Sequence, residues 1–219
     1  MMQMQKIKRL CLSRGRFQIV NGGIQWLGND MALYAVPGDV RINAGMLPAM
    51  FDLTEKQVRE TAWSTKSEEE VNHAGVQLYD NLDGDMRLHK LPASATIAGD
   101  DLDVFYSDDG EIALLAASAL FSPIAKFTDV QYYARRCRSG WAIAAKNGYA
   151  LIAYIMPWTV GGDAISDTVL RLRDVLGVVI ANSRKAASAP DASEDILAHL
   201  KATYGEGAEV DEETGEVME

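Results

Sequence analysis

Two short glycine-containing turns constrain the fold of this chain more than any other sequence feature. Asn21-Gly22-Gly23 interrupts the apolar segment 17–27, and Lys146-Asn147-Gly148 interrupts the apolar segment 141–156. Glycine and asparagine supply the positive φ angles that a tight hairpin turn requires. Both segments are therefore predicted to form antiparallel β-hairpins, which directs the chain towards folds built on antiparallel sheets.

Other strands are expected around these two hairpins. Apolar runs at 31–36 and 40–42 predict two short strands. The runs 76–79 and 86–89, on either side of a polar turn, predict a further hairpin. Residues 130–138 also have the composition of a strand.

Helices are expected where a polar cap precedes apolar residues. Asp108-Asp109-Gly110 is predicted to cap a helix over 111–121, which Pro123 ends. Acidic residues at its start suit the positive end of the helix dipole. A helix-like segment is also expected over 44–52, with Pro48 tolerated near its first turn.

The segment 54–73 gives mixed signals. Thr54 and Gln57 have the spacing of a capping box, which favours a helix, but residues 58–63 have strand composition, so both possibilities stay open. Residues 64–73, which include three consecutive glutamates, are expected to form a polar loop.

The charge of the chain is divided unevenly along its length. The 219 residues include 31 acids and 21 bases, which gives a net charge of −10. Residues 1–16 carry five bases and no acid, whereas residues 191–219 carry ten acids and one base. Between them, residues 17–125 are acidic and residues 126–190 are basic. The tail holds most of the net charge, so an acidic total does not exclude a nucleic-acid partner.

The composition is that of a globular protein, and it excludes collagenous, disulfide-rich and wholly disordered classes. No signal peptide is expected, because arginines interrupt the apolar residues of the N-terminus. The most apolar stretch, 141–158, is too short and too interrupted to span a bilayer. Cys11 and Cys137 belong to no CxxC pair and fit cytosolic thiols. We therefore expect a cytoplasmic protein without a membrane partner.

The expected domain organisation follows from where these patterns change. Residues 1–160 are expected to form an α+β domain of antiparallel sheets, built from hairpins with packed helices. Residues 161–190 contain an amphipathic helix, expected over 163–187, that packs on this domain or on a partner. A short helix over 191–205 and a disordered acidic tail over 206–219 follow. The apolar stripe of the amphipathic helix supplies three candidate partner-binding residues, Leu172, Leu176 and Ile180.

Common catalytic and metal-binding motifs are missing. The chain has no GxxxxGKS/T, GxGxxG, HExxH or GxSxG motif and no EF-hand loop. No two of its three histidines have metal-ligand spacing. The acids of segment 100–111 are interpreted as a charged turn and a helix cap, with a divalent-metal site or an acid–base pair as the alternative. No catalytic residue, cofactor or metal site is predicted, and the chain is not expected to be an enzyme.

Basic residues interleaved with aromatic residues give the clearest nucleic-acid-like pattern. Arginine contacts phosphate, and aromatic rings stack on unpaired bases. On a strand, however, Arg135 and Arg136 face opposite sides, so half-buried aromatic residues beside solvated arginines remain an equal alternative. The candidate DNA-binding residues are Lys126, Arg135, Arg136, Arg138 and Lys146.

Two segments resemble the DNA polymerase sliding clamps, or processivity factors. The first is Gly23–Leu33, in which an apolar run ends in a small residue and Asp before a second strand, and a strand and short helix follow at 40–51. The second is Gly148–Pro157, an apolar run that closes on Met-Pro, as the final clamp hairpin does. Across residues 17–157, this resemblance implies helices laid on antiparallel sheets, a homo-oligomer, DNA contact and a polymerase or recombination protein as partner. Clamps line their DNA channel with basic helices, whereas the helix expected over 111–121 carries no base.

These features support a ranked set of functions. The first is a non-enzymatic, sliding-clamp-like accessory protein of DNA replication or recombination. The acidic residues 210–217 resemble tails of phage-encoded replication proteins, which favours a phage or mobile element as the source. The alternatives are a single-stranded DNA-binding or recombination accessory, a protein–protein adaptor without DNA contact, and a small enzyme built on the acids of segment 100–111.

Overall fold

The computed structural model describes residues 2–158 and four residues of the C-terminal tail. Within the first range, residues 37, 39, 40, 98, 110, 111 and 139 are not described. The chain divides into two compact units, Met1–Val160 and Gly161–Glu219.

The second unit is described only at two short strands. These are β11 (Glu209–Val210) and β12 (Val217–Met218), which pair antiparallel. The helices expected over 163–187 and 191–205 lie outside the described residues, as do Leu172, Leu176 and Ile180 and the rest of the tail.

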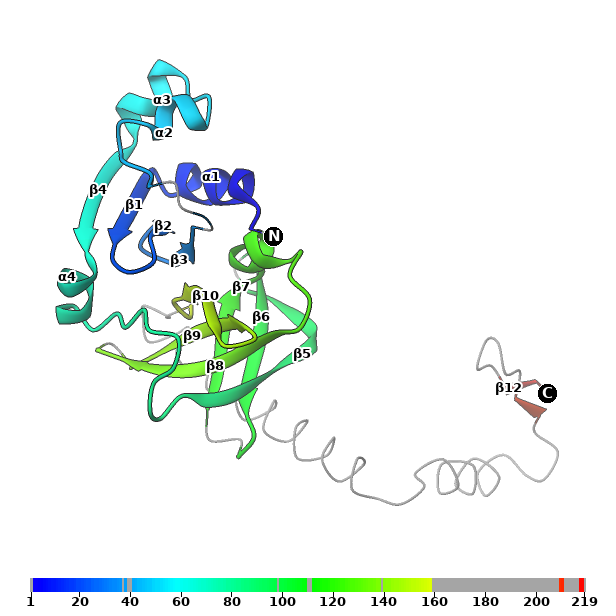
Figure 1. The fold of residues 1–219 in the computed structure, drawn as a ribbon. Helices are drawn as coiled ribbons and strands as arrows, with labels where there is room; N and C mark the ends of the chain where they lie inside the picture. Colours follow the sequence, from blue (N-terminus) through cyan, green and yellow to red (C-terminus); the bar gives the residue numbers. More distant parts are fainter. Residues whose placement is uncertain are drawn as a thin grey trace, which may run out of the picture. The chain divides into compact units, whose positions relative to one another are not determined.

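The first unit is built on one ten-stranded sheet (Figure 1). Its spatial order is β4-β1-β2-β3-β10-β9-β8-β5-β6-β7, and every neighbouring pair is antiparallel except β1 with β4. In chain order the strands are β1 (Arg16–Asn21), β2 (Trp26–Gly28), β3 (Ala32–Ala35), β4 (Ala62–Ser67), β5 (Met86–Ile97), β6 (Asp100–Ser107), β7 (Ala113–Ala117), β8 (Val130–Cys137), β9 (Gly140–Asn147) and β10 (Ala150–Ile155). The expected α+β class, with a mainly antiparallel sheet, is confirmed.

The helices of the first unit are short. They are α1 (Met4–Ser13), α2 (Leu47–Met50), α3 (Glu55–Glu60), α4 (Glu68–His73) and the 3₁₀ helix η1 (Ser118–Ile124). Among the described residues, no helix has the length and apolar character needed to cross a membrane.

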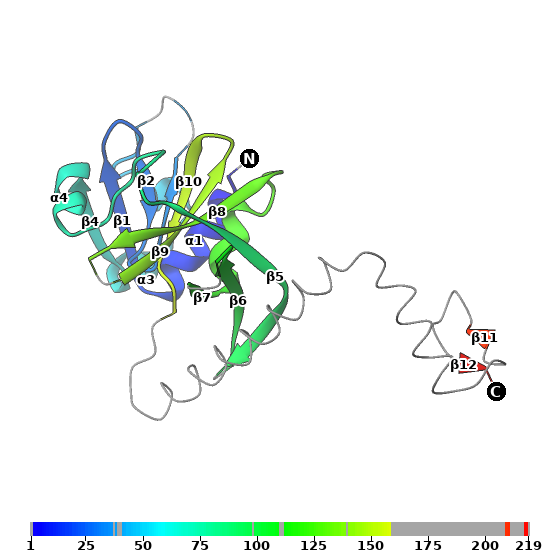
Figure 2. The same cartoon turned by 90° about the horizontal axis from the view of Figure 1, so that it is seen from below.

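Both faces of the sheet are covered, which explains why several strands are apolar at consecutive positions. Ile19 belongs to the larger core cluster, together with residues of α1 and η1, whereas the neighbouring Val20 belongs to a second cluster with Val71 of α4. Successive side chains of a strand point to opposite faces, so these two clusters lie on the two sides of the sheet. Figure 2 shows β5, β6 and β7 set apart from β1 and β4, on the far side of β8, β9 and β10.

Two helix–meander motifs meet at the centre of the sheet, and each consists of a helix followed by a three-stranded antiparallel meander. One motif is α1-β1-β2-β3, and the other is η1-β8-β9-β10. They meet where β3 pairs antiparallel with β10, with Tyr34 opposite Ala153 and Leu33 opposite Tyr154. The two helices also contact each other.

The hairpins predicted from the two glycine-containing turns are confirmed. Val20 of β1 lies opposite Trp26 of β2, and Asn147 of β9 lies opposite Ala150 of β10. At the second turn, Gly148 has a φ of +61°, a conformation that glycine adopts without steric cost. The strands expected near 31–36 and 130–138 are confirmed as β3 and β8.

The helix predicted over 111–121 is wrong. Asp108 and Asp109 lie in the turn between β6 and β7, and the alanine- and leucine-rich residues that follow pair with β6. The Ser107 hydroxyl accepts a hydrogen bond from the Ile112 amide at 3.0 Å, which closes the turn. Pairing with a neighbouring strand thus overrides the helix propensity of alanine and leucine. Pro123, expected to end a helix, lies inside η1.

The hairpin predicted between 76–79 and 86–89 is also wrong. Residues 76–79 form no strand, and β5 pairs instead with β6 and β8. The carbonyl oxygens of Gln77 and Tyr79 accept hydrogen bonds from the Arg135 guanidinium, so a side chain replaces a partner strand here.

Two capping boxes determine where helices begin in the segment 54–73. Thr54 and Gln57 form the first box at the start of α3, and β4 follows, so the helix and the strand are both present. Ser67 and Glu70 form a second box, which starts α4. The polar loop predicted over 64–73 is therefore wrong.

The segment from 40 to 52 is less regular than expected. Arg41 and Ile42 lie in a loop, so the strand predicted there is wrong over these residues. The helix expected over 44–52 is reduced to the single turn α2, in which Pro48 lies near the first position.

Candidate nucleic-acid interface

Arg135 of β8 lies inside the protein rather than on its surface. Its side chain is 1% exposed, and Nε and Nη2 donate to the two carboxylate oxygens of Asp85 at 2.9 and 2.7 Å. Nη1 donates to the Gln77 and Tyr79 carbonyl oxygens at 2.9 and 2.6 Å. Through the bidentate pair with Asp85 and the bonds to the two carbonyl oxygens, the guanidinium holds the loop between α4 and β5 in place.

Lys146 of β9 joins the same buried network. Its ammonium group donates to Asp85 at 2.9 Å and to the Asn81 side chain at 3.1 Å, and it lies 4.4 Å from the centre of the Tyr133 ring. Burial alone would raise the pKa of Asp85, but the hydrogen bonds and charges of Arg135 and Lys146 outweigh it and hold that pKa below its ordinary value. A DNA phosphate could reach these two bases only if this loop moved away.

The remaining sequence-predicted bases are exposed. Arg136 stacks on Trp141, with 4.7 Å between the guanidinium carbon and the ring centre. Arg138 lies at the end of β8, and Lys126 lies in the loop after η1. The structure therefore separates the five predicted bases into a buried pair and three exposed residues, and DNA contact by the exposed three stays a prediction.

The basic N-terminal segment folds into α1, a helix that the sequence analysis did not anticipate. Ile7 and Cys11, four residues apart, are fully buried against the sheet. The Cys11 thiol donates to the Gly28 carbonyl oxygen, and burial raises its pKa to about 12, with the charge of Asp30 as a smaller cause. The other side of the helix, including Arg9, faces solvent.

Contacts between α1 and η1 bring Lys126 to this helix. Gln3 donates through its amide to the Pro123 carbonyl oxygen at 2.9 Å and through its side chain to the Ser122 carbonyl oxygen at 3.1 Å. A hollow of about 510 Å³ lies at this junction. The described residues of its lining include three basic residues and no acidic one: Met2, Gln3, Met4, Gln5, Lys6, Arg9 and Lys126.

The bases of this basic hollow are free to meet an anion. Within the described part of the chain, no carboxylate lies within ion-pair distance of Lys6, Arg9 or Lys126, and none of these charged groups donates a hydrogen bond. The signal that could have revealed this site is the run of five bases without an acid over residues 1–16. Lys126 is distant from this run in the sequence, and only the fold brings it to the site.

The acids of the segment 100–111 are dispersed rather than gathered. Asp103 pairs with Lys90 at 2.7 Å and accepts a hydrogen bond from Ser118 at 2.9 Å, while Asp108 pairs with His89. Among the residues that the structure describes, no group of three or more His, Cys, Asp or Glu side chains is placed to hold a metal ion.

Comparisons with known protein families, with curated proteins and with solved structures find no match to this chain.

Proposed function

We propose that this protein is a non-enzymatic accessory factor of DNA replication or recombination. In this proposal it has a sliding-clamp-like arrangement and contacts the DNA backbone through α1. The observation that carries the proposal is the basic hollow, in which Lys6, Arg9 and Lys126 lie together with no acid beside them among the described residues. The chain as a whole has a net charge of −10, so a cluster of basic residues without acidic partners departs from its overall acidity. Phosphate is the anion that such clusters commonly contact.

The arrangement of the helices supports the clamp-like part of the proposal. The resemblance to sliding clamps implies helices laid on antiparallel sheets, with bases on the helices that face DNA. Here α1 and η1 each precede a three-stranded meander and contact each other, and α1 supplies the bases that the segment 111–121 lacks.

The ends of the sheet support the expected homo-oligomer. β4 is the first strand in the spatial order and β7 the last, and among the described strands each has a neighbour on one side only. The Leu115 carbonyl oxygen of β7 accepts a hydrogen bond from the Trp158 amide, whereas the residues of β4 are largely exposed. An open strand edge is able to pair with a second copy. Light scattering coupled to size-exclusion chromatography is expected to find an oligomer, and a monomer at micromolar concentration would contradict a ring.

DNA contact is tested by fluorescence anisotropy on a labelled duplex over a range of salt concentrations. The triple variant Lys6→Ala/Arg9→Ala/Lys126→Ala is expected to bind more weakly. Its slope of log K against log salt is expected to be smaller by about 0.9 for each lost phosphate contact.

The matched control is Lys56→Ala/Arg59→Ala/Lys66→Ala, which removes the same charge from exposed positions of α3 and β4. This control is expected to keep most of the affinity and nearly the whole salt slope. Absence of duplex and single-strand binding by the unaltered protein at low salt would reject the proposed function. Equal losses in the two triple variants would reject α1 as the interface.

A further inference from the structure

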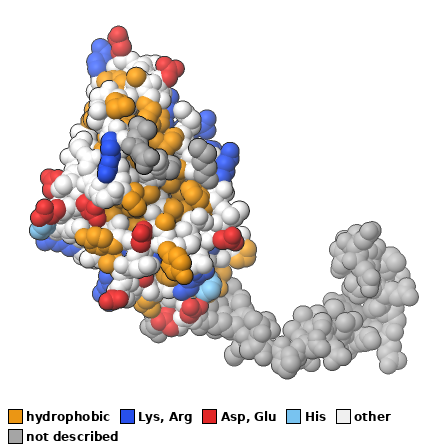
Figure 3. Space-filling view, in the orientation of Figure 1, with side chains coloured by type: hydrophobic (Ala, Val, Ile, Leu, Met, Phe, Trp, Pro, Cys, Tyr) orange, Lys and Arg blue, Asp and Glu red, His pale blue; other side chains and the backbone are white. Residues whose placement is uncertain are grey.

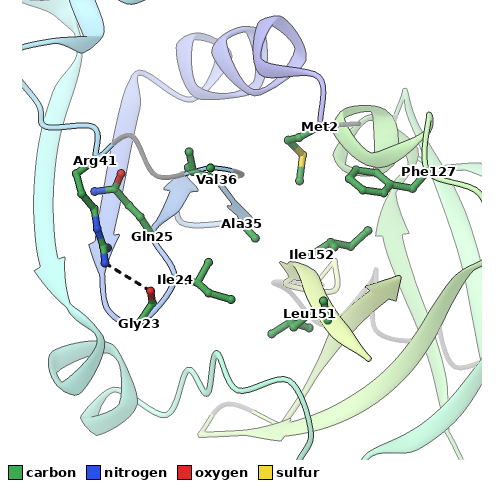
Figure 4. A pocket seen from close by; sticks show the side chains of 12 residues that line it. Met2, Gly23, Ile24, Gln25, Ala35, Val36, Arg41, Phe127, Leu151 and Ile152 are labelled. Carbon is green, nitrogen blue, oxygen red and sulfur yellow. Dashed lines mark hydrogen bonds between the residues drawn. The ribbon is translucent and has the colours of Figure 1, made fainter. Parts of the chain in front are cut away.

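A second hollow, of about 530 Å³, adjoins the basic hollow (Figure 4). Both hollows are lined by Met2, and the consecutive residues Lys126 and Phe127 line one each. The second hollow is formed by residues of β3 and β10, the turn between β1 and β2, and other loops beside them. We refer to the two hollows together as the α1 groove.

The floor of the second hollow is apolar. Figure 4 shows Ile24, Val36, Leu151 and Ile152 standing around a common space, with Phe127 at its far side. Ile24 is 41% exposed, one of the few large apolar side chains in the described chain that solvent reaches to this extent. Figure 3 shows hydrophobic side chains gathered across the same face of the molecule. Ligand-binding pockets are commonly lined in this way, by apolar side chains with a few polar or charged groups among them.

The ends of the α1 groove are basic. Arg41 lies at one end, where Nη1 donates to the Gly22 carbonyl oxygen at 3.0 Å, and Lys6, Arg9 and Lys126 lie at the other. Among the residues that the structure describes, no acid lines either hollow. The groove therefore combines an apolar floor with cationic ends, which complements a polyanion that carries flat apolar groups.

An exposed aromatic residue directly precedes a residue that lines this groove. Tyr149, at the turn between β9 and β10, is 87% exposed, and the next residue, Ala150, lines the apolar hollow. The turn is held in place because the Asn147 side chain donates to the Thr128 carbonyl oxygen at 2.6 Å. An exposed ring on an anchored turn is suited to stacking on a nucleobase.

We propose that the α1 groove binds single-stranded DNA, with phosphates at its basic ends, unpaired bases on its apolar floor and one base stacked on Tyr149. This inference rests on the proposed function and specifies the form of DNA that the site prefers. In a duplex, the base faces are stacked and unavailable, so a duplex offers the groove only its phosphates. A polyanion is favoured over an apolar peptide because the described lining of the groove holds four basic residues, Arg41, Lys6, Arg9 and Lys126, and no acidic one.

The test compares a labelled oligo(dT) with a duplex of the same length by anisotropy. Tyr149→Ala is expected to weaken binding to oligo(dT) by about 5- to 100-fold and to leave duplex binding nearly unchanged. Tyr149→Phe keeps the ring and is expected to bind as the unaltered protein does. The matched control is Tyr79→Ala, which removes another exposed tyrosine, from the loop before β5.

A second variant tests the floor of the groove. Ile24→Asp places a negative charge at a solvent-accessible position and is expected to weaken oligo(dT) binding by at least tenfold, with an unchanged thermal midpoint. Duplex binding that depends on Lys6, Arg9 and Lys126, together with oligo(dT) binding that is indifferent to Tyr149 and Ile24, would overturn this inference and leave the proposed function standing. If neither DNA binds, the proposed function itself fails. A peptide whose binding is lost in Ile24→Asp, while that variant still binds oligo(dT) as the unaltered protein does, would assign the apolar hollow to a protein partner and would also overturn the inference.

Discussion

Two groups of basic residues in this protein have opposite surroundings. Arg135 and Lys146 are buried and share the carboxylate of Asp85, whereas Lys6, Arg9 and Lys126 have no acidic partner among the described residues. A buried base must be paired, because leaving its charge without a partner in the protein interior is costly. An exposed base has no such requirement and can serve an external anion. The comparison teaches that burial, rather than residue type, distinguishes basic residues that stabilise the fold from those that are candidates for binding an anion.

The largest expected effect comes from removing the shared carboxylate. Asp85→Ala leaves two buried positive charges without a partner, so it is expected to lower the free energy of unfolding by about 3–5 kcal/mol. Urea denaturation followed by circular dichroism measures this loss. Asp83→Ala, an exposed acid in the same loop, is the control and is expected to change little. Similar stability of the two variants would contradict the structural role assigned to Asp85.

The second effect is a pH dependence of the stabilisation that Asp85 provides through Arg135 and Lys146. The pKa of Asp85 is lowered in the folded protein, so the unfolded chain takes up a proton first as the pH falls. The stabilisation is complete above the ordinary carboxyl pKa of about 3.9 and is lost as the pH falls through that value towards the folded pKa. The difference in unfolding free energy between the unaltered protein and Asp85→Asn is therefore expected to narrow between about pH 5 and pH 3. A difference that stays constant over this range would argue against the ion pair as its source.

A smaller effect is expected for the exposed base that stacks on an aromatic ring. Arg136→Ala removes the guanidinium from the face of Trp141 and is expected to cost about 0.5–1 kcal/mol. The fluorescence of the tryptophans should change in the same variant, because Trp141 gains exposure to water. Arg138→Ala, which changes an exposed arginine just after the end of β8, should leave both the stability and the fluorescence unchanged. An equal change in this variant would remove the stacking explanation.

The smallest effect on stability is expected at the α1 groove. The triple variant Lys6→Ala/Arg9→Ala/Lys126→Ala should unfold within about 0.5 kcal/mol of the unaltered protein, since these side chains pair with no described residue. Thermal denaturation checks this expectation beside the DNA-binding assay. A large destabilisation would place these bases in the structural group and would erase the distinction between the two groups.

Some elements of the fold could be predicted because their information is local. Asn21-Gly22-Gly23 and Lys146-Asn147-Gly148 specify tight turns through the backbone angles that their residues allow. The start of α1 has no sequence signal, because Gln3 provides no side-chain cap and the first turn of the helix contains no acidic residue. Ile7 and Cys11 have helical spacing, but Arg9 between them also interrupts an apolar run, and the sequence alone does not show which of the two readings applies.

Other elements depend on partners that are distant in the sequence. The residues of β7 have helix-forming composition, and only pairing with β6 makes them a strand. Arg135 was a reasonable DNA-binding candidate until Asp85, fifty residues earlier in the chain, was found beside it. Lys126 joins Lys6 and Arg9 only because η1 packs against α1. Single-sequence patterns do not report such contacts, so the location of the candidate site had to come from the fold.

The pairing of β3 with β10 has a consequence for how the protein is made. Ala32 lies opposite Ile155 in the sheet, so the middle of the sheet joins residues that leave the ribosome at very different times. Until β10 is synthesised, β3 remains an unprotected strand edge that neighbouring chains can pair with. Contacts between such distant residues also slow folding. The nascent chain therefore reaches its native sheet only late in synthesis, and a chain that stops before residue 150 lacks the strand that closes it.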